Sequence, residues 1–223
     1  MSKIKAVLFD LDNTLIDFMR MKTQSSDAAI QAMIDAGLQI KENKAKKILF
    51  SLFKKYGIED QTIFQKFLEK TIKKIDYRIL SNGIAAYRRV QAGFLFPYPH
   101  VRSTLVKLKE KNLMLGIVSD APRMRAWLRL AEMNMTHYFD VVVTLDDTGL
   151  LKPNKMPFEK AVKSLKFKPE EILFVGDNPE RDILGAKEAG MKTCLAEYGQ
   201  NVFSKKIKAD YRIKDVEQLL KIV

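Results

Sequence analysis

The chain has 223 residues, of which 47% are hydrophobic and 30% are charged, so it can bury a sizeable core. This composition excludes an intrinsically disordered chain, and no apolar run approaches the ~20 residues that a membrane-spanning helix requires. The single cysteine, Cys194, excludes an intrachain disulfide and a zinc site made of several thiolates. We therefore expect a cytoplasmic protein without a membrane partner.

The formal net charge of +12 would suit a partner that carries phosphate, including nucleic acid. Lysines are densest in residues 41–55 and 66–74, where apolar side chains recur between them at helical spacing. This pattern is typical of solvated helix faces that cover a core. The charge alone therefore does not predict a nucleic-acid partner, and we expect none.

The first predicted element is a strand at residues 4–10, and a helical block follows it. Apolar spacing predicts helices at residues 21–36, 42–56, 60–79 and 83–92. We expect Gly37, Gly57 and Gly83 to separate these helices, since glycine commonly ends a helix. No strand pattern interrupts the block, which indicates a helical domain inserted after the first strand.

From residue 97 onward, short apolar strands alternate with amphipathic helices. The predicted strands are residues 113–118, 141–144, 172–175 and 193–196, and the predicted helices are residues 101–111, 123–133, 155–165, 180–189 and 216–221. This alternation predicts an α/β fold, with a Rossmann-like parallel sheet and helices on both of its faces. We assign residues 1–16 and 95–223 to this core and residues 17–94 to an all-helical domain.

Polar residues follow the predicted strands. Asp10 and Asp12 end the first strand, and Ser119 and Asp120 end the second, just before a helix whose N–H groups can bind phosphate. Open α/β sheets place their ligands at this edge. We therefore expect these four side chains to lie close together.

Two further signals come later in the chain. Lys152 precedes Pro153 at the start of a predicted helix, and Gly176-Asp177 is followed by Asp182 after four intervening residues. A lysine beside several carboxylates can balance negative charge, and paired carboxylates suit a hard metal ion. The order of the signals along the sheet is hard to explain as chance.

In these four motifs the chain resembles phosphatases of the haloacid dehalogenase superfamily that carry a helical cap after the first strand. The resemblance implies that Asp10 is the nucleophile and forms an aspartyl-phosphate. It also implies that Asp12 protonates the leaving oxygen and later accepts a proton from water. Phosphoryl transfer needs both functions, together with positive charge around the phosphate.

The same resemblance implies a Mg²⁺ site made of Asp10, Asp177 and the backbone carbonyl of Asp12. Asp182 would orient Lys152 or a metal-bound water, or bind the metal directly. Ser119 would donate to a phosphoryl oxygen and Lys152 would balance its charge. We expect Asp120 to contribute to substrate binding with these two residues.

Three functions remain open at this stage. Asp12 and the pair Asp177 and Asp182 favour phosphoryl transfer over dehalogenation, because the dehalogenases of this superfamily lack the second aspartate of the first motif. A phosphomutase uses the same four motifs and remains the nearest alternative. A non-catalytic nucleic-acid-binding module is a more distant one. The expected cap implies a small substrate, and the resemblance implies one of the sugar or triose phosphate type. We expect a monomer or a small homo-oligomer.

Overall fold

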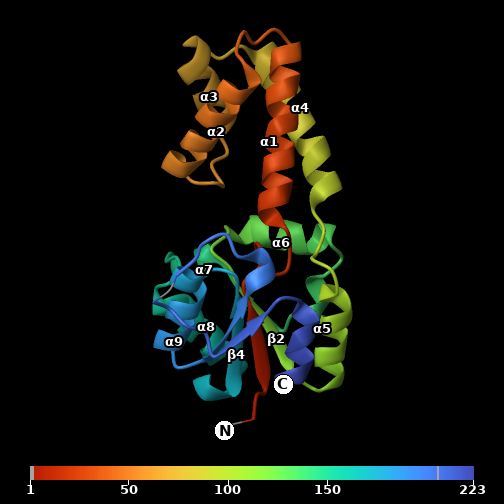
Figure 1. The fold of residues 1–223 in the computed structure, drawn as a ribbon, viewed down its shortest axis with the longest axis vertical. Coiled ribbons are helices and arrows are strands. Elements are labelled where there is room, and N and C mark those ends of the chain that lie inside the picture. The colour runs from red at the N-terminus through yellow and green to blue at the C-terminus, as the bar shows by residue number, and fades with distance from the viewer. Residues whose placement is uncertain (1–2, 205) are drawn as a thin grey trace. The chain divides into compact units, whose positions relative to one another are not determined.

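A computed structural model describes residues 3–204 and 206–223, which form two compact units (Figure 1). One unit contains the chain up to Phe18 and from Phe96 onward, and we call it the α/β unit. The other, which we call the helical unit, is Met19–Leu95. Among the described residues, no helix is both long and apolar enough to cross a membrane.

The α/β unit is built on a six-stranded sheet with the order β3-β2-β1-β4-β5-β6. Every neighbouring pair of these strands is parallel, which confirms the predicted α/β fold. The strands are β1 (Ala6–Phe9), β2 (Met114–Val118), β3 (Val141–Val143), β4 (Ile172–Gly176), β5 (Lys192–Ala196) and β6 (Tyr211–Ile213). Because β1 lies between β2 and β4, the residues that follow these three strands meet at one edge.

Helices lie on both faces of this sheet (Figure 1). The α-helices are α5 (Val101–Glu110), α6 (Arg123–Glu132), α7 (Leu145–Thr148), α8 (Lys155–Leu165) and α9 (Leu184–Glu188). On one face Phe158 of α8 packs edge-to-face on Phe174 of β4, with ring centroids 5.0 Å apart. Leu8 and Ala186 belong to the same buried cluster. Burial of such side chains is the main force that holds helix to sheet.

Several short helical turns connect these elements. They are 3₁₀ turns at Thr136–Tyr138, Pro169–Glu171, Glu197–Gly199 and Val216–Lys221, and a π-helical turn at Pro179–Ile183. The predicted helix at residues 216–221 is therefore a 3₁₀ helix. The predicted helix at residues 180–189 is in fact the π-helical turn followed by α9. The structure adds β6 and α7, which were not predicted.

The helical unit contains α1 (Phe18–Asp35), α2 (Glu42–Tyr56), α3 (Ile63–Ile72) and α4 (Tyr77–Phe94). The first residue of α1, Phe18, still belongs to the α/β unit. Its core brings together apolar side chains from all four helices, among them Met33, Leu49, Phe67 and Leu80. These residues recur at helical spacing, so each helix presents one apolar stripe to the others.

The predicted single helix at residues 60–79 and the predicted break at Gly83 are wrong. The chain breaks after α3, where Lys73 has a φ of 59°. Asp76 then caps α4 by accepting from the backbone N–H groups of Arg78 and Ile79. Gly83 lies inside α4, where a Cβ atom would come within 2.2 Å of the Met33 Cε atom. Close packing against α1 therefore explains this glycine.

Candidate active site

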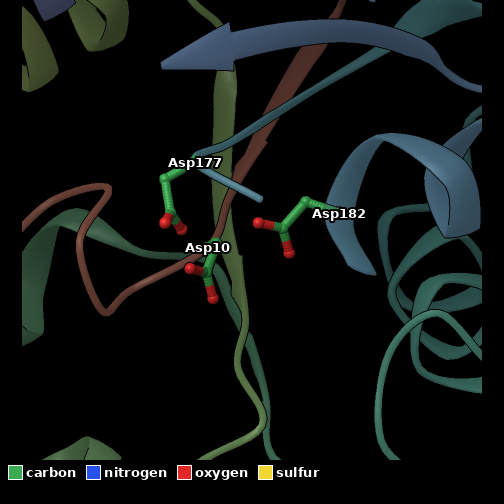
Figure 2. Close-up of side chains that lie close together, drawn as sticks. All are labelled: Asp10, Asp177 and Asp182. Carbon is green, nitrogen blue, oxygen red and sulfur yellow. The ribbon is translucent and has the colours of Figure 1, made fainter. Parts of the chain in front are cut away.

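Three carboxylates converge at the carboxyl edge of the sheet (Figure 2). Phe9 is in register with Val175, so Asp10 and Asp177 follow adjacent strands. Asp182 comes from the π-helical turn after β4. Asp10, Asp177 and Asp182 are all buried, and each offers an oxygen within 4.8 Å of those of the other two. The structure therefore brings together three of the residues that the sequence selected.

The close approach of Asp182 depends on Gly176. A Cβ atom at position 176 would lie 2.5 Å from the Cβ atom of Asp182, so any larger residue would displace the carboxylate. Asp182 Oδ2 accepts from the backbone N–H of Asn178 at 3.0 Å. The Asn178 side chain in turn accepts from the N–H groups of Glu180 and Arg181. These contacts fix the turn that carries Asp182.

Lys152 lies between two of these carboxylates. Its Nζ atom is 2.6 Å from Asp10 Oδ1 and 2.7 Å from Asp182 Oδ1, and it donates to the Val118 carbonyl at 3.1 Å. Burial alone would lower the pKa of Lys152, but the charges of Asp10 and Asp182 outweigh it and raise the pKa. Lys152 therefore stays cationic and compensates buried negative charge.

Asp120 anchors the segment that carries Lys152. Its Oδ1 atom accepts from the Lys152 backbone N–H at 2.9 Å, and its Oδ2 atom accepts from Arg181 at 3.1 Å. Both carboxylate oxygens of Asp120, which we predicted to bind substrate, therefore accept hydrogen bonds from other residues of this chain. Arg181 was not selected from the sequence. Although burial would lower its pKa, Asp10 and Asp182 raise it, so this guanidinium adds a second positive charge.

Ser119 follows β2 directly and is buried. Its backbone N–H donates to the Val143 carbonyl at 2.9 Å, which continues the sheet pairing for one more residue. Its Oγ atom accepts from the Ala121 N–H at 3.2 Å. Because β2 is the neighbour of β1, the hydroxyl belongs to the same edge of the sheet as Asp10.

The side chain of Asp12 has a different partner from that of Asp10. Its Oδ2 atom accepts from Nη1 of Arg129 on α6 at 2.6 Å. The carboxylate of Asp12 is not part of the convergent group formed by Asp10, Asp177 and Asp182. Arg129 was not selected from the sequence either, although an arginine aligned with Ala126 and Leu130 on the apolar face of a helix was a usable signal.

The convergent carboxylates fit a hard divalent cation. Within the described part of the chain, Asp177 Oδ1 is a buried oxygen without a hydrogen-bond partner. Burial, followed by the charges of Asp10 and Asp182, raises the pKa of Asp177 to about 8. A buried all-oxygen donor set is what Mg²⁺ prefers, and a cation there would offset the repulsion.

Comparison with known proteins agrees with this geometry. The family described as haloacid dehalogenase-like hydrolase matches residues 7–196. A glyceraldehyde 3-phosphate phosphatase of Methanocaldococcus jannaschii is 34% identical over 99% of this chain and 97% of the relative. Pyrophosphatase PpaX of Halalkalibacterium halodurans is 31% identical, over 99% of this chain and 97% of the relative.

A solved structure supports the same relationship. The crystal structure of a HAD phosphatase from Thermococcus onnurineus superposes with a TM-score of 0.71 at 26% identity. The match covers 98% of this chain and 97% of the other. The likeness therefore extends over both units, each of which has a counterpart in a chain of nearly the same length.

Proposed function

The chain belongs to the haloacid dehalogenase-like hydrolase family as a phosphatase, and we propose that it hydrolyses phosphate monoesters of small metabolites through an aspartyl-phosphate on Asp10. The observation that carries the proposal is the pairing of buried Asp10 with Lys152 at 2.6 Å, at the carboxyl end of the central strand. This pairing places a cation beside the carboxylate nucleophile and beside the incoming phosphate.

In the first step an Asp10 carboxylate oxygen forms a bond to phosphorus while the bond from phosphorus to the leaving oxygen breaks. Asp12 donates its proton to that leaving oxygen, so that an alcohol departs. In the second step water attacks phosphorus and the bond to Asp10 breaks. Asp12 takes the proton from the water, which restores the starting state and releases inorganic phosphate.

Other residues support the transferring group. Ser119 donates to a phosphoryl oxygen, and Lys152 offsets its negative charge. We propose that Asp182 holds the Lys152 side chain in place, since Asp182 Oδ1 lies 2.7 Å from Lys152 Nζ. Asp10, Asp177 and the backbone carbonyl of Asp12 would hold Mg²⁺, which when bound supplies positive charge for the phosphoryl oxygens.

We further propose that residues 17–94 form a cap that selects a small substrate and excludes water. The relatives named as glyceraldehyde 3-phosphate phosphatases make a triose phosphate the first candidate. The relative named as a pyrophosphatase makes pyrophosphate the necessary comparison. Both are small anions, which a net charge of +12 would attract.

The test is phosphate release from glyceraldehyde 3-phosphate, sugar phosphates and pyrophosphate, with Mg²⁺ and with excess chelator. We expect Mg²⁺-dependent release, which Asp10→Asn reduces at least ~10³-fold because the nucleophile is lost. Circular dichroism checks that the variant is folded, and Glu159→Gln, at an exposed surface pair with Lys155, serves as the control that keeps activity. Substantial activity in folded Asp10→Asn would contradict the mechanism, and a phosphorylated isomer in place of free phosphate would indicate a mutase.

A further inference from the structure

Arg129 is a buried arginine on the apolar side of α6. Only 6% of Arg129 is exposed. Its neighbours on the same side of the helix are buried as well: Ala126, Leu130 and Met133. Arginine is rarely buried without a partner, because removing its charge from water is energetically costly. The position of this side chain therefore calls for an explanation in its contacts.

Two contacts hold its guanidinium group inside the α/β unit. Nη1 donates to Asp12 Oδ2 at 2.6 Å, and the guanidinium carbon lies 4.4 Å from the centre of the Phe18 ring. Asp12 and Phe18 both belong to the segment that follows β1. A guanidinium held over an aromatic ring has less freedom to move, which helps to hold its partner carboxylate in one orientation.

We infer that Arg129 is a positioning residue for Asp12: it holds the carboxyl group in the orientation from which a proton passes to the leaving oxygen. The inference rests on the proposed function, in which Asp12 exchanges that proton. A general acid must lie within hydrogen-bond reach of its target. Asp12 stands in the loop after β1, and a contact from α6 fixes its side chain there.

Stability alone gives a weak reason for this ion pair. An apolar side chain would fill the same place beside Ala126 and Leu130 without removing a charge from water. The stem of Arg129 already supplies apolar packing. The guanidinium group therefore serves to orient the Asp12 carboxyl group, which a methionine of similar length would not do.

Leaving groups of different acidity separate positioning from simple structural support. An alkyl phosphate releases a strongly basic alkoxide, which needs the proton of Asp12 in the transition state. 4-Nitrophenyl phosphate releases a stable anion that departs without protonation. Misplacing Asp12 therefore slows the first ester far more than the second, whereas general damage to the site slows both alike.

The experiment measures kcat and KM for glycerol phosphate and for 4-nitrophenyl phosphate with Mg²⁺, in wild type, Arg129→Met and Arg129→Lys. We expect Arg129→Met to lower kcat for glycerol phosphate about 10- to 100-fold and kcat for the aryl ester less than about threefold, with KM little changed. Arg129→Lys keeps a cation, so its ratio of kcat for glycerol phosphate to kcat for 4-nitrophenyl phosphate should be close to that of the wild type. Arg123→Met is the matched control, because Arg123 begins the same helix and its exposed side chain pairs with Asp147.

A second arm introduces Arg129→Met into Asp12→Asn. If Arg129 acts through Asp12, the ratio of the two kcat values changes no further in the double variant. An equal loss on both esters, or a full additional loss in the double variant, overturns the inference while leaving the proposed function standing. A wild-type protein that releases phosphate from none of the substrates tested overturns the proposed function, and with it this role of Arg129.

Discussion

The charge of Asp177 depends on which other groups occupy the site. Its carboxylate is buried beside those of Asp10 and Asp182, and Lys152 and Arg181 only partly offset the repulsion. A buried charge without full compensation favours the neutral form of the group. The pKa of Asp177 is therefore raised to about 8, and that of Asp182 is raised as well, mainly by burial.

The raised pKa predicts how stability changes with pH in the absence of metal. The folded state binds the Asp177 proton more tightly than the unfolded state, so protonation of Asp177 stabilises the fold. This stabilisation is complete below the pKa that Asp177 has in the unfolded chain, and it is lost as the pH rises through about 8. We expect the unfolding temperature in chelator to fall between about pH 6 and about pH 9, and added Mg²⁺ to stabilise more at the higher pH. Thermal unfolding followed by circular dichroism measures both.

Asp177→Asn is the control for this prediction, because an amide has no charge to lose. The variant should show a weaker fall in unfolding temperature over the same pH range and little stabilisation by Mg²⁺. A wild-type protein whose unfolding temperature rises from about pH 6 to about pH 9 in chelator would contradict the assignment.

At the same scale, the sequence could predict the residues that follow strands but not those that arrive from helices. Asp10, Ser119 and Asp177 each come directly after an apolar run, so their placement at one edge of the sheet follows from parallel strand order. Arg129 is 117 residues from Asp12, and only the packing of α6 brings the two together. Arg181 lies inside a recognised motif, but its pairing with Asp120 depends on the π-helical turn, which apolar spacing does not encode.

At the scale of elements, α4 shows how packing can override local propensity. Glycine inside a helix costs ~1 kcal/mol relative to alanine, which is why Gly83 was read as a break. Here the missing Cβ lets α4 approach Met33 of α1 closely. The strand β6 escaped prediction for the opposite reason, since a three-residue strand at the edge of a sheet leaves almost no periodic pattern.

Two glycines of α4 therefore respond oppositely to alanine. Gly83→Ala should destabilise the protein by about 1–3 kcal/mol, because the new Cβ would meet Met33 Cε and Cγ at 2.2 and 2.7 Å. Gly93→Ala, with no atom within 4 Å of its Cβ, should be neutral or stabilise by up to ~1 kcal/mol. Urea unfolding of both variants checks this, and equal effects would show that helix propensity alone decides.

At the scale of the whole molecule, each unit has a buried apolar cluster of its own among the described residues. Met33 and Phe67 belong to a cluster made only of residues from the helical unit, whereas Leu8 and Phe174 belong to one in the α/β unit. All three convergent carboxylates lie in the α/β unit. A ligand of these carboxylates therefore binds directly to the α/β unit.

We expect Mg²⁺ to slow amide hydrogen exchange in β1 and β4 and to leave α2 and α3 nearly unchanged. At a concentration of about 100 times the dissociation constant, binding adds ~2.7 kcal/mol, or a ~100-fold slowing of exchange through the opening of the α/β unit. Hydrogen exchange with mass spectrometry resolves the two regions, and Asp177→Asn should remove the effect. Equal slowing in α2 and α3 would show that both units open as one.

The central position of β1 has a consequence for how the chain is made. Ala6 pairs with Met114 on one side and with Ile172 on the other, so the strand before Asp10 is synthesised long before either neighbour exists. At roughly 5–20 residues per second, a ribosome takes on the order of ten seconds to reach β4. The core of the helical unit is made of residues from Met19–Leu95 alone, all of which are translated before β4. Asp10 is therefore translated long before Lys152 and Asp177, and the group that these residues form assembles only after β4 has been made.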